Sequence, residues 1–209
     1  MNLFISPIDK EVSWDKNMEL VSKTDQNGTI KYCNENFVNI SGYEEHELVG
    51  KPHNIIRHPD MPKVIFKILW DHILNGEDFH AVVKNMAKSG RYYWVITQFE
   101  IIKNSNGVIT GYIGRRKSVS ENVARTLEKL YIKLKKIEEQ VNVEAAEDYF
   151  NGYLDDQKKT YQEFLNDILE DDMLMKQIEE NSRQTLNSNQ ELIQESKTRK
   201  SFLRSLFGG

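Results

Sequence analysis

Residues that interrupt helices are scarce in the second half of this 209-residue chain. No proline follows Pro62, no histidine follows His80, and Gly152 is the only glycine within residues 115–207. Proline and glycine are the least favourable residues inside a helix. We therefore expect residues 118–209 to form α-helices, after a first part that holds all four prolines, all five histidines and all three tryptophans.

Cysteine and long apolar runs are also lacking. Cys33 is the single cysteine, which excludes a disulfide framework and a cysteine-rich zinc site within the chain and fits a reducing compartment. No run of about 18 apolar residues occurs, and the first residues lack the basic-then-apolar order of a secretory signal. We expect a cytoplasmic protein that does not insert into a membrane by itself.

The charge pattern excludes several function classes. Charged residues make up 29% of the chain, the net charge is −4, and basic and acidic residues are interspersed, so a basic stripe for nucleic acid is absent. The helical part carries no histidine for phosphotransfer, no glycine-rich nucleotide motif and no convincing acidic metal cluster. We expect neither an enzyme nor a metal site.

The first part reads as two strands, several short helices and three further strands. Strands over residues 18–24 and 29–33 flank Asp25-Gln26-Asn27-Gly28, a turn sequence typical of a β-hairpin. Helices are expected over residues 34–40, 44–48 and 62–75, and strands over residues 79–85, 92–102 and 108–116. The sequence predicts a domain over residues 18–117, preceded by an N-terminal cap (1–17) and followed by a helical signalling or partner-docking segment (118–209).

Apolar residues in the helical part recur at steps of three and four, as in a coiled-coil seam. The seam is Leu127, Leu130 or Tyr131, Leu134, Ile137 and Val141, and a second helix is expected after a break near Asn142 or Gly152. Two interpretations stay open. The helices fold back on each other or on the sheet, or they form a coiled coil or a partner-docking surface.

The segment from Lys51 to Pro62 concentrates polar groups beside prolines. Arg57, His58 and Asp60 stand next to Pro59, in a bent chain that can hold a polar ligand. The alternative is a structural turn in which Asp60 pairs with Arg57.

A series of short motifs in order along residues 18–117 resembles the PAS domain of Aer-type aerotaxis receptors. The similarity is closer still to the stand-alone PAS subunits of bipartite bacterial energy-taxis systems. The motifs include Asn34-Glu35-Asn36-Phe37, Ser41-Gly42-Tyr43, Arg57-His58-Pro59-Asp60-Met61-Pro62, Trp70, Lys84-Asn85, Tyr93-Trp94-Val95 and Gly111-Tyr112. The resemblance does not extend to the helices after Glu121.

This resemblance implies an α+β PAS fold: a five-stranded antiparallel sheet with short helices on one face, enclosing FAD. The positions that match the family's flavin-binding set are Asn34, Arg57, His58, Asp60, Phe66, Trp70 and Asn85. Phe79 departs from the pattern, since the family has tryptophan there, and it lacks the indole N–H donor. The Asn85 amide can both donate and accept, which suits a group whose hydrogen bonding changes on reduction.

The expected function is a redox or oxygen sensor in energy taxis that signals to a membrane chemoreceptor or its cytoplasmic signalling region, with a PAS or coiled-coil homodimer as a further possibility. Two alternatives stay open: a haem-binding gas sensor using His53, His58, His72 or His80, and a cofactor-free interaction module. Cysteinyl-adduct photochemistry is not expected, because Cys33 lies on the second predicted strand.

Overall fold

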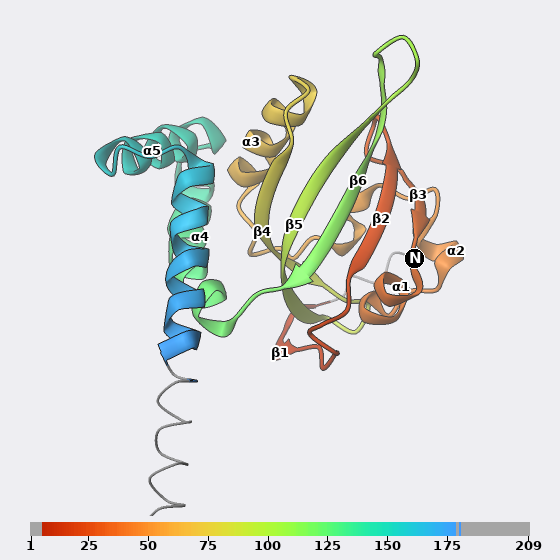
Figure 1. Cartoon of the computed structure of the whole chain (residues 1–209), viewed down its shortest axis with the longest axis horizontal. Coiled ribbons are helices and arrows are strands. Elements are labelled where there is room, and N and C mark those ends of the chain that lie inside the picture. The colour runs from red at the N-terminus through yellow and green to blue at the C-terminus, as the bar shows by residue number, and fades with distance from the viewer. Residues whose placement is uncertain (1–5, 179, 181–209) are drawn as a thin grey trace, which may run out of the picture. The chain divides into compact units, whose positions relative to one another are not determined.

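A computed structural model describes residues 6–178 and 180 of the chain, and Figure 1 shows its course. The chain divides into two compact units, residues 1–165 and residues 166–209. The sheet and its covering helices all belong to the first unit. This division differs from the predicted boundary at residue 118, because the first helices after the sheet pack within the first unit.

Five strands form the antiparallel sheet that the sequence predicts (Figure 1). They are β2 (Leu20–Asp25), β3 (Ile30–Cys33), β4 (Phe79–Met86), β5 (Arg91–Lys103) and β6 (Ile109–Ser118). β4 pairs with β5, β5 with β6, β6 with β2, and β2 with β3. The last strand therefore lies beside the first hairpin, and β4 forms an edge.

The hairpin between β2 and β3 turns where the sequence indicates. One carboxylate oxygen of Asp25 accepts hydrogen bonds from the backbone N–H groups of Asn27 and Thr29, each at 3.0 Å. Gly28 has a φ of +78°, a conformation that glycine adopts at little cost. The turn chemistry alone predicts this hairpin.

A sixth strand, β1 (Ile8–Glu11), lies outside the sequence prediction. It pairs in parallel with the start of β5, where Ile8 faces Arg91. All four of its residues are exposed, so it lacks the alternation that marks a half-buried strand. A Cβ at Gly90 would lie 2.4 Å from the carbonyl oxygen of Ser6, so this approach depends on glycine.

Four short helical segments connect β3 to β4. They are α1 (Glu35–Ser41), α2 (Glu45–Leu48), the 3₁₀ helix η1 (His53–Ile56) and α3 (Lys63–Leu74). α3 buries Val64, Ile65, Leu69 and Ile73, a spacing that places one apolar stripe against the sheet. The three predicted helices are confirmed, and η1 adds a turn inside the polar segment before Pro62.

The helix α4 (Glu121–Gln140) packs back on the sheet. Leu127 and Leu134 are 0% exposed and Tyr131 is 2% exposed. The ring of Tyr131 stacks on Trp94 of β5 with 6.1 Å between centroids, and its hydroxyl donates to the carbonyl of Val82 at 2.8 Å. The structure therefore supports the intramolecular interpretation of this part of the seam.

The helix α5 (Val143–Asp156) begins directly after α4. The side chain of Asn142 accepts a hydrogen bond from the backbone N–H of Ala145 at 2.8 Å, which caps the new helix. The predicted break thus lies at Asn142, while Gly152 stays inside α5. A further helical stretch begins at residue 161.

Side chains from the later helices and from the loop before α3 cover the free edge of β4. The carbonyl of His80 accepts from the Gln162 side chain at 3.1 Å, and the carbonyl of Val82 accepts from Tyr131. The N–H of Lys84 donates to the sulfur of Met61 at 3.2 Å. An exposed strand edge can pair with another chain, and these three contacts occupy that edge.

In the second unit, the described residues 166–178 and 180 are helical. Met173, Leu174, Met175 and Ile178 are 49–70% exposed there. Within the described residues of the whole chain, no helix combines the length and the apolar character needed to cross a bilayer. The predicted apolar patch at Phe202, Leu203, Leu206 and Phe207 lies outside the described residues.

Candidate functional site

A cavity of about 230 Å³ lies between the inner face of the sheet, α3 and η1. Its walls are largely aromatic and aliphatic, with Phe66, Leu69, Trp70, Ile73, Val83, Phe99 and Tyr112 among the lining residues. Three further lining residues, Asn27, Pro52 and Asn54, are exposed. The cavity is therefore an apolar site that opens to solvent beside the β2–β3 turn and η1.

Four of the seven predicted site residues line this cavity: Arg57, Phe66, Trp70 and Asn85. The guanidinium carbon of Arg57 lies 3.6 Å from the centroid of the Phe66 ring, a cation–π contact. Trp70 meets Tyr112 edge-to-face with 5.5 Å between ring centroids. The backbones of Arg57 and Asn85 pair as an isolated antiparallel bridge, which fixes the Arg57 loop to β4.

The other three predicted site residues, Asn34, His58 and Asp60, are not among the lining residues. Asn34 caps α1, because its side-chain oxygen accepts from the N–H groups of Val21 and Phe37 at 3.0 Å. Asn34 therefore fixes the start of α1 against β2, and any part it has in binding stays a prediction.

His58 and Asp60 make their contacts within the 57–62 segment and with β4 and β5, where the His58 ring meets Tyr92 edge-to-face with 6.4 Å between centroids. The backbone N–H of Asp60 donates to Nδ1 of His58 at 3.1 Å, and the Asp60 carboxylate lies 2.9 Å from the Lys84 ammonium. The segment is therefore a turn held by side-chain contacts. Asp60 pairs with Lys84, whereas Arg57 was the partner considered from the sequence. The Lys84 ammonium lies between the carboxylates of Asp60 and Glu128, at 2.9 Å from each.

Sequence reasoning missed a polar cluster in the cavity wall, in which Arg116 and Ser22 are buried and His53 is half-buried. The guanidinium of Arg116 lies 3.0 Å from Nε2 of His53 and donates to the Ser22 hydroxyl at 3.0 Å and to the Gly114 carbonyl at 2.9 Å. Arg116 is 3% exposed, and no carboxylate pairs with it among the described residues. The cluster places an uncompensated positive charge in the wall.

Burial governs the protonation of this cluster. It lowers the pKa of His53 well below the usual value, and the nearby Arg116 charge lowers it further. His53 is therefore neutral, and its Nε2 accepts from Arg116. Burial also lowers the pKa of Arg116 to about 10, so the guanidinium keeps its charge at neutral pH.

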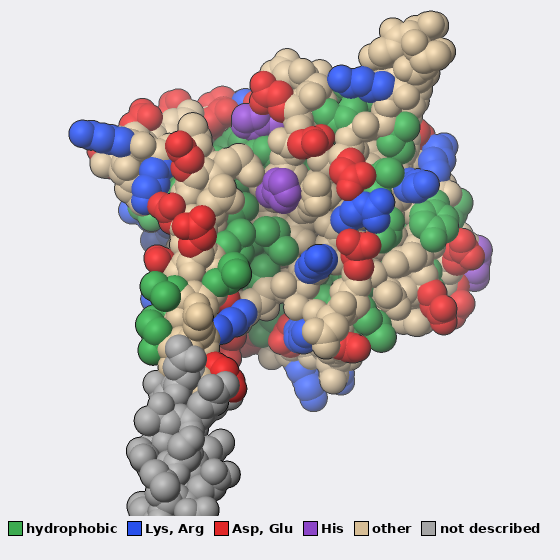
Figure 2. All heavy atoms as spheres, in the orientation of Figure 1, with side chains coloured by type: hydrophobic (Ala, Val, Ile, Leu, Met, Phe, Trp, Pro, Cys, Tyr) green, Lys and Arg blue, Asp and Glu red, His purple; other side chains and the backbone are tan. Residues whose placement is uncertain are grey.

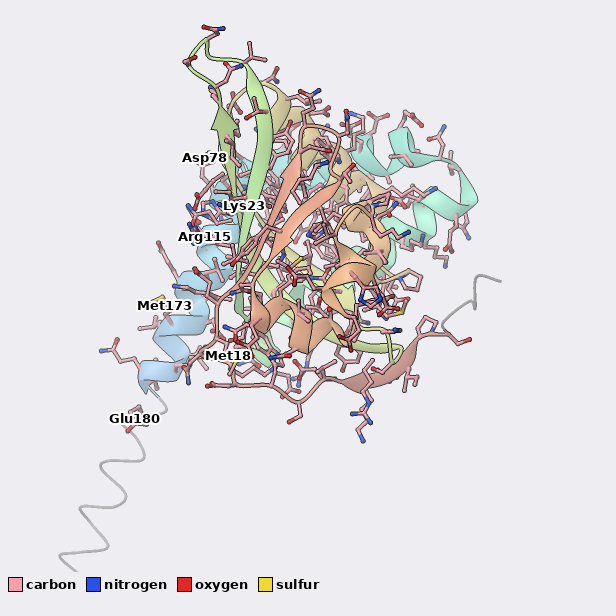
Figure 3. The ribbon with its side chains drawn as sticks, turned by 90° about the vertical axis from the view of Figure 1, so that its right-hand side faces the viewer. Met18, Lys23, Asp78, Arg115, Met173 and Glu180 are labelled. Atoms are coloured by element: carbon pink, nitrogen blue, oxygen red, sulfur yellow. The ribbon has the colours of Figure 1, made fainter. Side chains whose placement is uncertain are left out.

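The alternation of β6 is the signal that could have found Arg116. Tyr112, Gly114 and Arg116 share one face of the strand, and all three line the cavity. Arg115 faces outward and pairs with Glu100 at 2.7 Å and Glu19 at 3.4 Å. Figure 3 shows Arg115 near Lys23 on that outer side of the sheet, where Figure 2 shows basic and acidic side chains intermixed.

Several buried polar atoms at the cavity have no hydrogen-bond partner within the described residues. They are Nδ2 of Asn85, Oγ1 of Thr97 and Nε of Arg57. Two of the three are donors only, and the hydroxyl can also donate. An unpaired buried polar atom costs about 1–3 kcal/mol, so the site favours a planar apolar ligand with several acceptor atoms.

The histidines and the cysteine differ in whether they line the cavity, where a cofactor could contact them. Of the four histidines weighed as haem ligands, only His53 lines the cavity, and its Nε2 is held by Arg116 and by the Ser22 hydroxyl at 3.0 Å. Cys33 lies on β3, outside the lining, and burial raises the pKa of its thiol to about 11. Among the residues that the structure describes, no group of three or more histidine, cysteine or acidic side chains is placed to hold a metal ion.

Residues 30–116 match a family described as the PAS fold. The chain is 39% identical over 112 residues to the aerotaxis receptor of Escherichia coli strain K12, a match that covers 54% of this chain and 22% of the receptor. It is 29% identical over 101 residues to the bacterioopsin transcriptional activator of Halobacterium salinarum, covering 48% of this chain and 15% of that protein.

A solved light-oxygen-voltage domain, from a study with a flavin analogue, superimposes with a TM-score of 0.49 and 22% identity, covering 53% of this chain and 84% of that one. Of the aerotaxis receptor and the bacterioopsin transcriptional activator, the two curated relatives, the chain spans less than a quarter of the length. The family match over residues 30–116 runs from β3 into β6 and includes α1, α2, η1 and α3, whereas β1 and β2 precede it.

Proposed function

Because the sheet and its inner helices form a PAS domain related to that of an aerotaxis receptor, we propose that the cavity binds a flavin and that the chain is a redox or oxygen sensor. The observation that carries this proposal is the donor-rich cavity wall. Arg57, Asn85 and Thr97 carry buried polar atoms without a partner among the described residues, Arg116 adds a buried positive charge, and no carboxylate lines the cavity. A flavin ring supplies carbonyl and nitrogen acceptors on a flat aromatic frame.

The dimensions of the cavity support a bound ring more than a whole dinucleotide. Small-molecule sites are commonly about 300–1,000 Å³, and this cavity is about 230 Å³. The remainder of FAD would lie outside it, where Asn27, Pro52 and Asn54 are exposed. We propose FAD as the cofactor because the PAS domain is related to that of the aerotaxis receptor. FMN is the alternative flavin from which the experiment must distinguish it.

The protein's own residues supply the sensing chemistry in this proposal. A bound flavin changes its charge and its hydrogen bonding when it is reduced. Arg116 favours added negative charge at the ring, because a buried charge interacts strongly in a low dielectric. The Asn85 amide can present either its donor or its acceptor to the ring, so its orientation follows the state of the cofactor.

Signalling to a chemoreceptor forms the output of the proposed function. The aerotaxis receptor carries its PAS region within one longer protein, of which this chain matches 22%. We propose that this chain signals to a membrane chemoreceptor through its helical region, without enzymatic activity. The haem alternative has less support, because the only histidine in the lining is already bonded to Arg116.

The visible absorption spectrum of the purified chain tests the cofactor. We expect flavin bands, and chromatography of the released cofactor should identify FAD. A Soret band would favour the haem alternative, and a protein without visible absorption that also fails to bind added FAD, FMN or riboflavin would favour a cofactor-free interaction module.

A further inference from the structure

Lys84 lies next to Asn85 in β4, and the two side chains leave the strand on opposite faces. Asn85 lines the cavity, whereas the Lys84 ammonium lies 2.9 Å from Asp60 and 2.9 Å from Glu128 of α4. The side chain of Lys84 is 7% exposed. One buried cation therefore joins a cavity strand, the loop that carries Arg57, and a helix outside the family match.

The surroundings of Lys84 hold its charge in place. Burial opposes the charged form, but the hydrogen bonds that Lys84 donates to Asp60 and Glu128 outweigh it, so the pKa of Lys84 is raised. The ammonium also lies 4.8 Å from the ring centroid of Tyr92 and 5.8 Å from that of Trp94. Lys84 thus stays protonated and bonded to both carboxylates at neutral pH.

The loop over residues 57–61 is attached to β4 at two points, at Asn85 and at the backbone of Lys84. Its first residue, Arg57, pairs through the backbone with Asn85, and Met61 accepts from the N–H of Lys84 through sulfur at 3.2 Å. A shift of β4 or of Arg57 at the cavity therefore moves the carboxylate of Asp60 and the ammonium of Lys84 together.

Helix α4 touches both walls that enclose the cavity. Glu128 and Tyr131 bind it to β4, and Glu138 accepts a hydrogen bond from the backbone N–H of Val64 at 2.8 Å. Val64 lies in the first turn of α3, whose N-cap is Pro62 and offers no side-chain acceptor, so Glu138 supplies the missing cap. The position of α4 is thus set by the same two elements that hold Asn85 and Trp70.

We propose that Lys84 is a positioning residue that couples the cavity to α4, so that filling the cavity tightens the docking of α4 through the Asp60–Lys84–Glu128 bridge. Asp60 then serves in transmission and Arg57 in binding, although both stand in one sequence motif. The inference rests on the proposed function only for the identity of the ligand. Coupling between sites is reciprocal, so loosening α4 also weakens ligand binding.

Hydrogen–deuterium exchange of the full chain, with and without FAD, measures this coupling. In the wild type, FAD should slow exchange across residues 121–140, because a filled cavity holds β4 and the 57–61 loop in place. Glu128→Gln should abolish most of this slowing and raise the Kd for FAD by about fivefold or more. Lys84→Met should do the same, and Lys84→Arg should restore part of the response.

Glu147→Gln is the matched control. Lys67 and Glu147 lie 2.8 Å apart and join α3 to α5 without contacting β4 or the 57–61 loop. The same loss of one carboxylate there should leave the response of residues 121–140 and the Kd for FAD unchanged.

A second comparison does not depend on any ligand. Asn85→Ala perturbs the cavity wall directly, and it should speed exchange in residues 121–140 in the wild-type background but not with Glu128→Gln. If the chain binds no flavin, the proposed function is wrong, and this comparison still decides the coupling. If flavin binds but α4 exchange is the same with and without it, or if Glu128→Gln keeps the full response, Lys84 is a purely structural bridge.

Discussion

Nη2 of Arg116 lies 3.0 Å from Nε2 of His53 in the cavity wall, where Arg116 is buried and His53 is half-buried. A charged donor facing a neutral acceptor leaves net positive charge where most surrounding side chains are apolar. Buried charges are usually paired with an opposite charge, and Arg116 has none among the described residues. This arrangement underlies the predictions for Arg116 and for the pH dependence of stability.

Arg116→Gln should weaken flavin binding by about 10- to 100-fold, because hydrogen bonds to charged groups contribute about 1.5–3 kcal/mol. Fluorescence titration of the cofactor-free protein with FAD measures the Kd. Arg115→Gln is the control, since it removes the same charge from the adjacent residue on the outer face. Equal effects of the two substitutions would mean that Arg116 has no direct part in binding.

Asn85→Ala should lower flavin retention or shift the reduction potential while the domain stays folded. The reason is that its amide nitrogen has no protein partner at the cavity. Redox titration followed by absorption checks both quantities. Asn39→Ala, at an exposed position of α1, serves as the control, and full occupancy with an unchanged potential in Asn85→Ala would exclude Asn85 from the site.

Stability should fall as the pH drops below about 6.5. The pKa of His53 is depressed well below 6.5 in the folded state, so below that pH the unfolded chain binds a proton that the folded chain does not. The cost is up to about 1.4 kcal/mol for each pH unit until the folded pKa is reached. Above 6.5 the residue is neutral in both states and contributes no pH dependence.

Thermal melts of the cofactor-free protein between pH 5 and 8 measure this dependence. His53→Gln should flatten the slope, and His46→Gln, at an exposed position, should not. His58, whose pKa burial also lowers, should account for part of the remaining slope. An identical slope in wild type and His53→Gln would contradict the assignment.

Leu134→Asp should destabilise the first unit by about 2–5 kcal/mol, because it places a carboxylate at a fully buried position. The melting temperature should fall by on the order of 10 °C, while the mass in solution stays that of the wild type. Leu130→Asp, at a half-buried position, should cost less.

Ile132→Asp, at a position 61% exposed on the same helix, is the control and should leave the melting temperature unchanged. Normal stability of Leu134→Asp together with a loss of self-association would restore the coiled-coil interpretation of the seam.

The local elements of this protein follow from its sequence. Asp25 and Gly28 specify the first hairpin, Asn34 caps a helix, and Pro62 precedes α3, because turn and cap chemistry acts over a few residues. Motifs over residues 18–117 likewise identified the fold and predicted seven site residues, of which Arg57, Phe66, Trp70 and Asn85 line the cavity whereas Asn34, His58 and Asp60 do not. The absence of proline and the scarcity of glycine beyond the sheet indicated the later helices.

The tertiary structure determined on which face of the sheet each strand side chain lies. Successive residues of a strand point to opposite faces, so Arg115 and Arg116, or Lys84 and Asn85, have opposite roles that adjacency in sequence conceals. It also decided that α4 packs on β4, because a heptad seam is equally suited to another chain and to its own sheet. Only the packing of distant segments brings Glu128 to Lys84 and leaves Arg116 without a counter-charge.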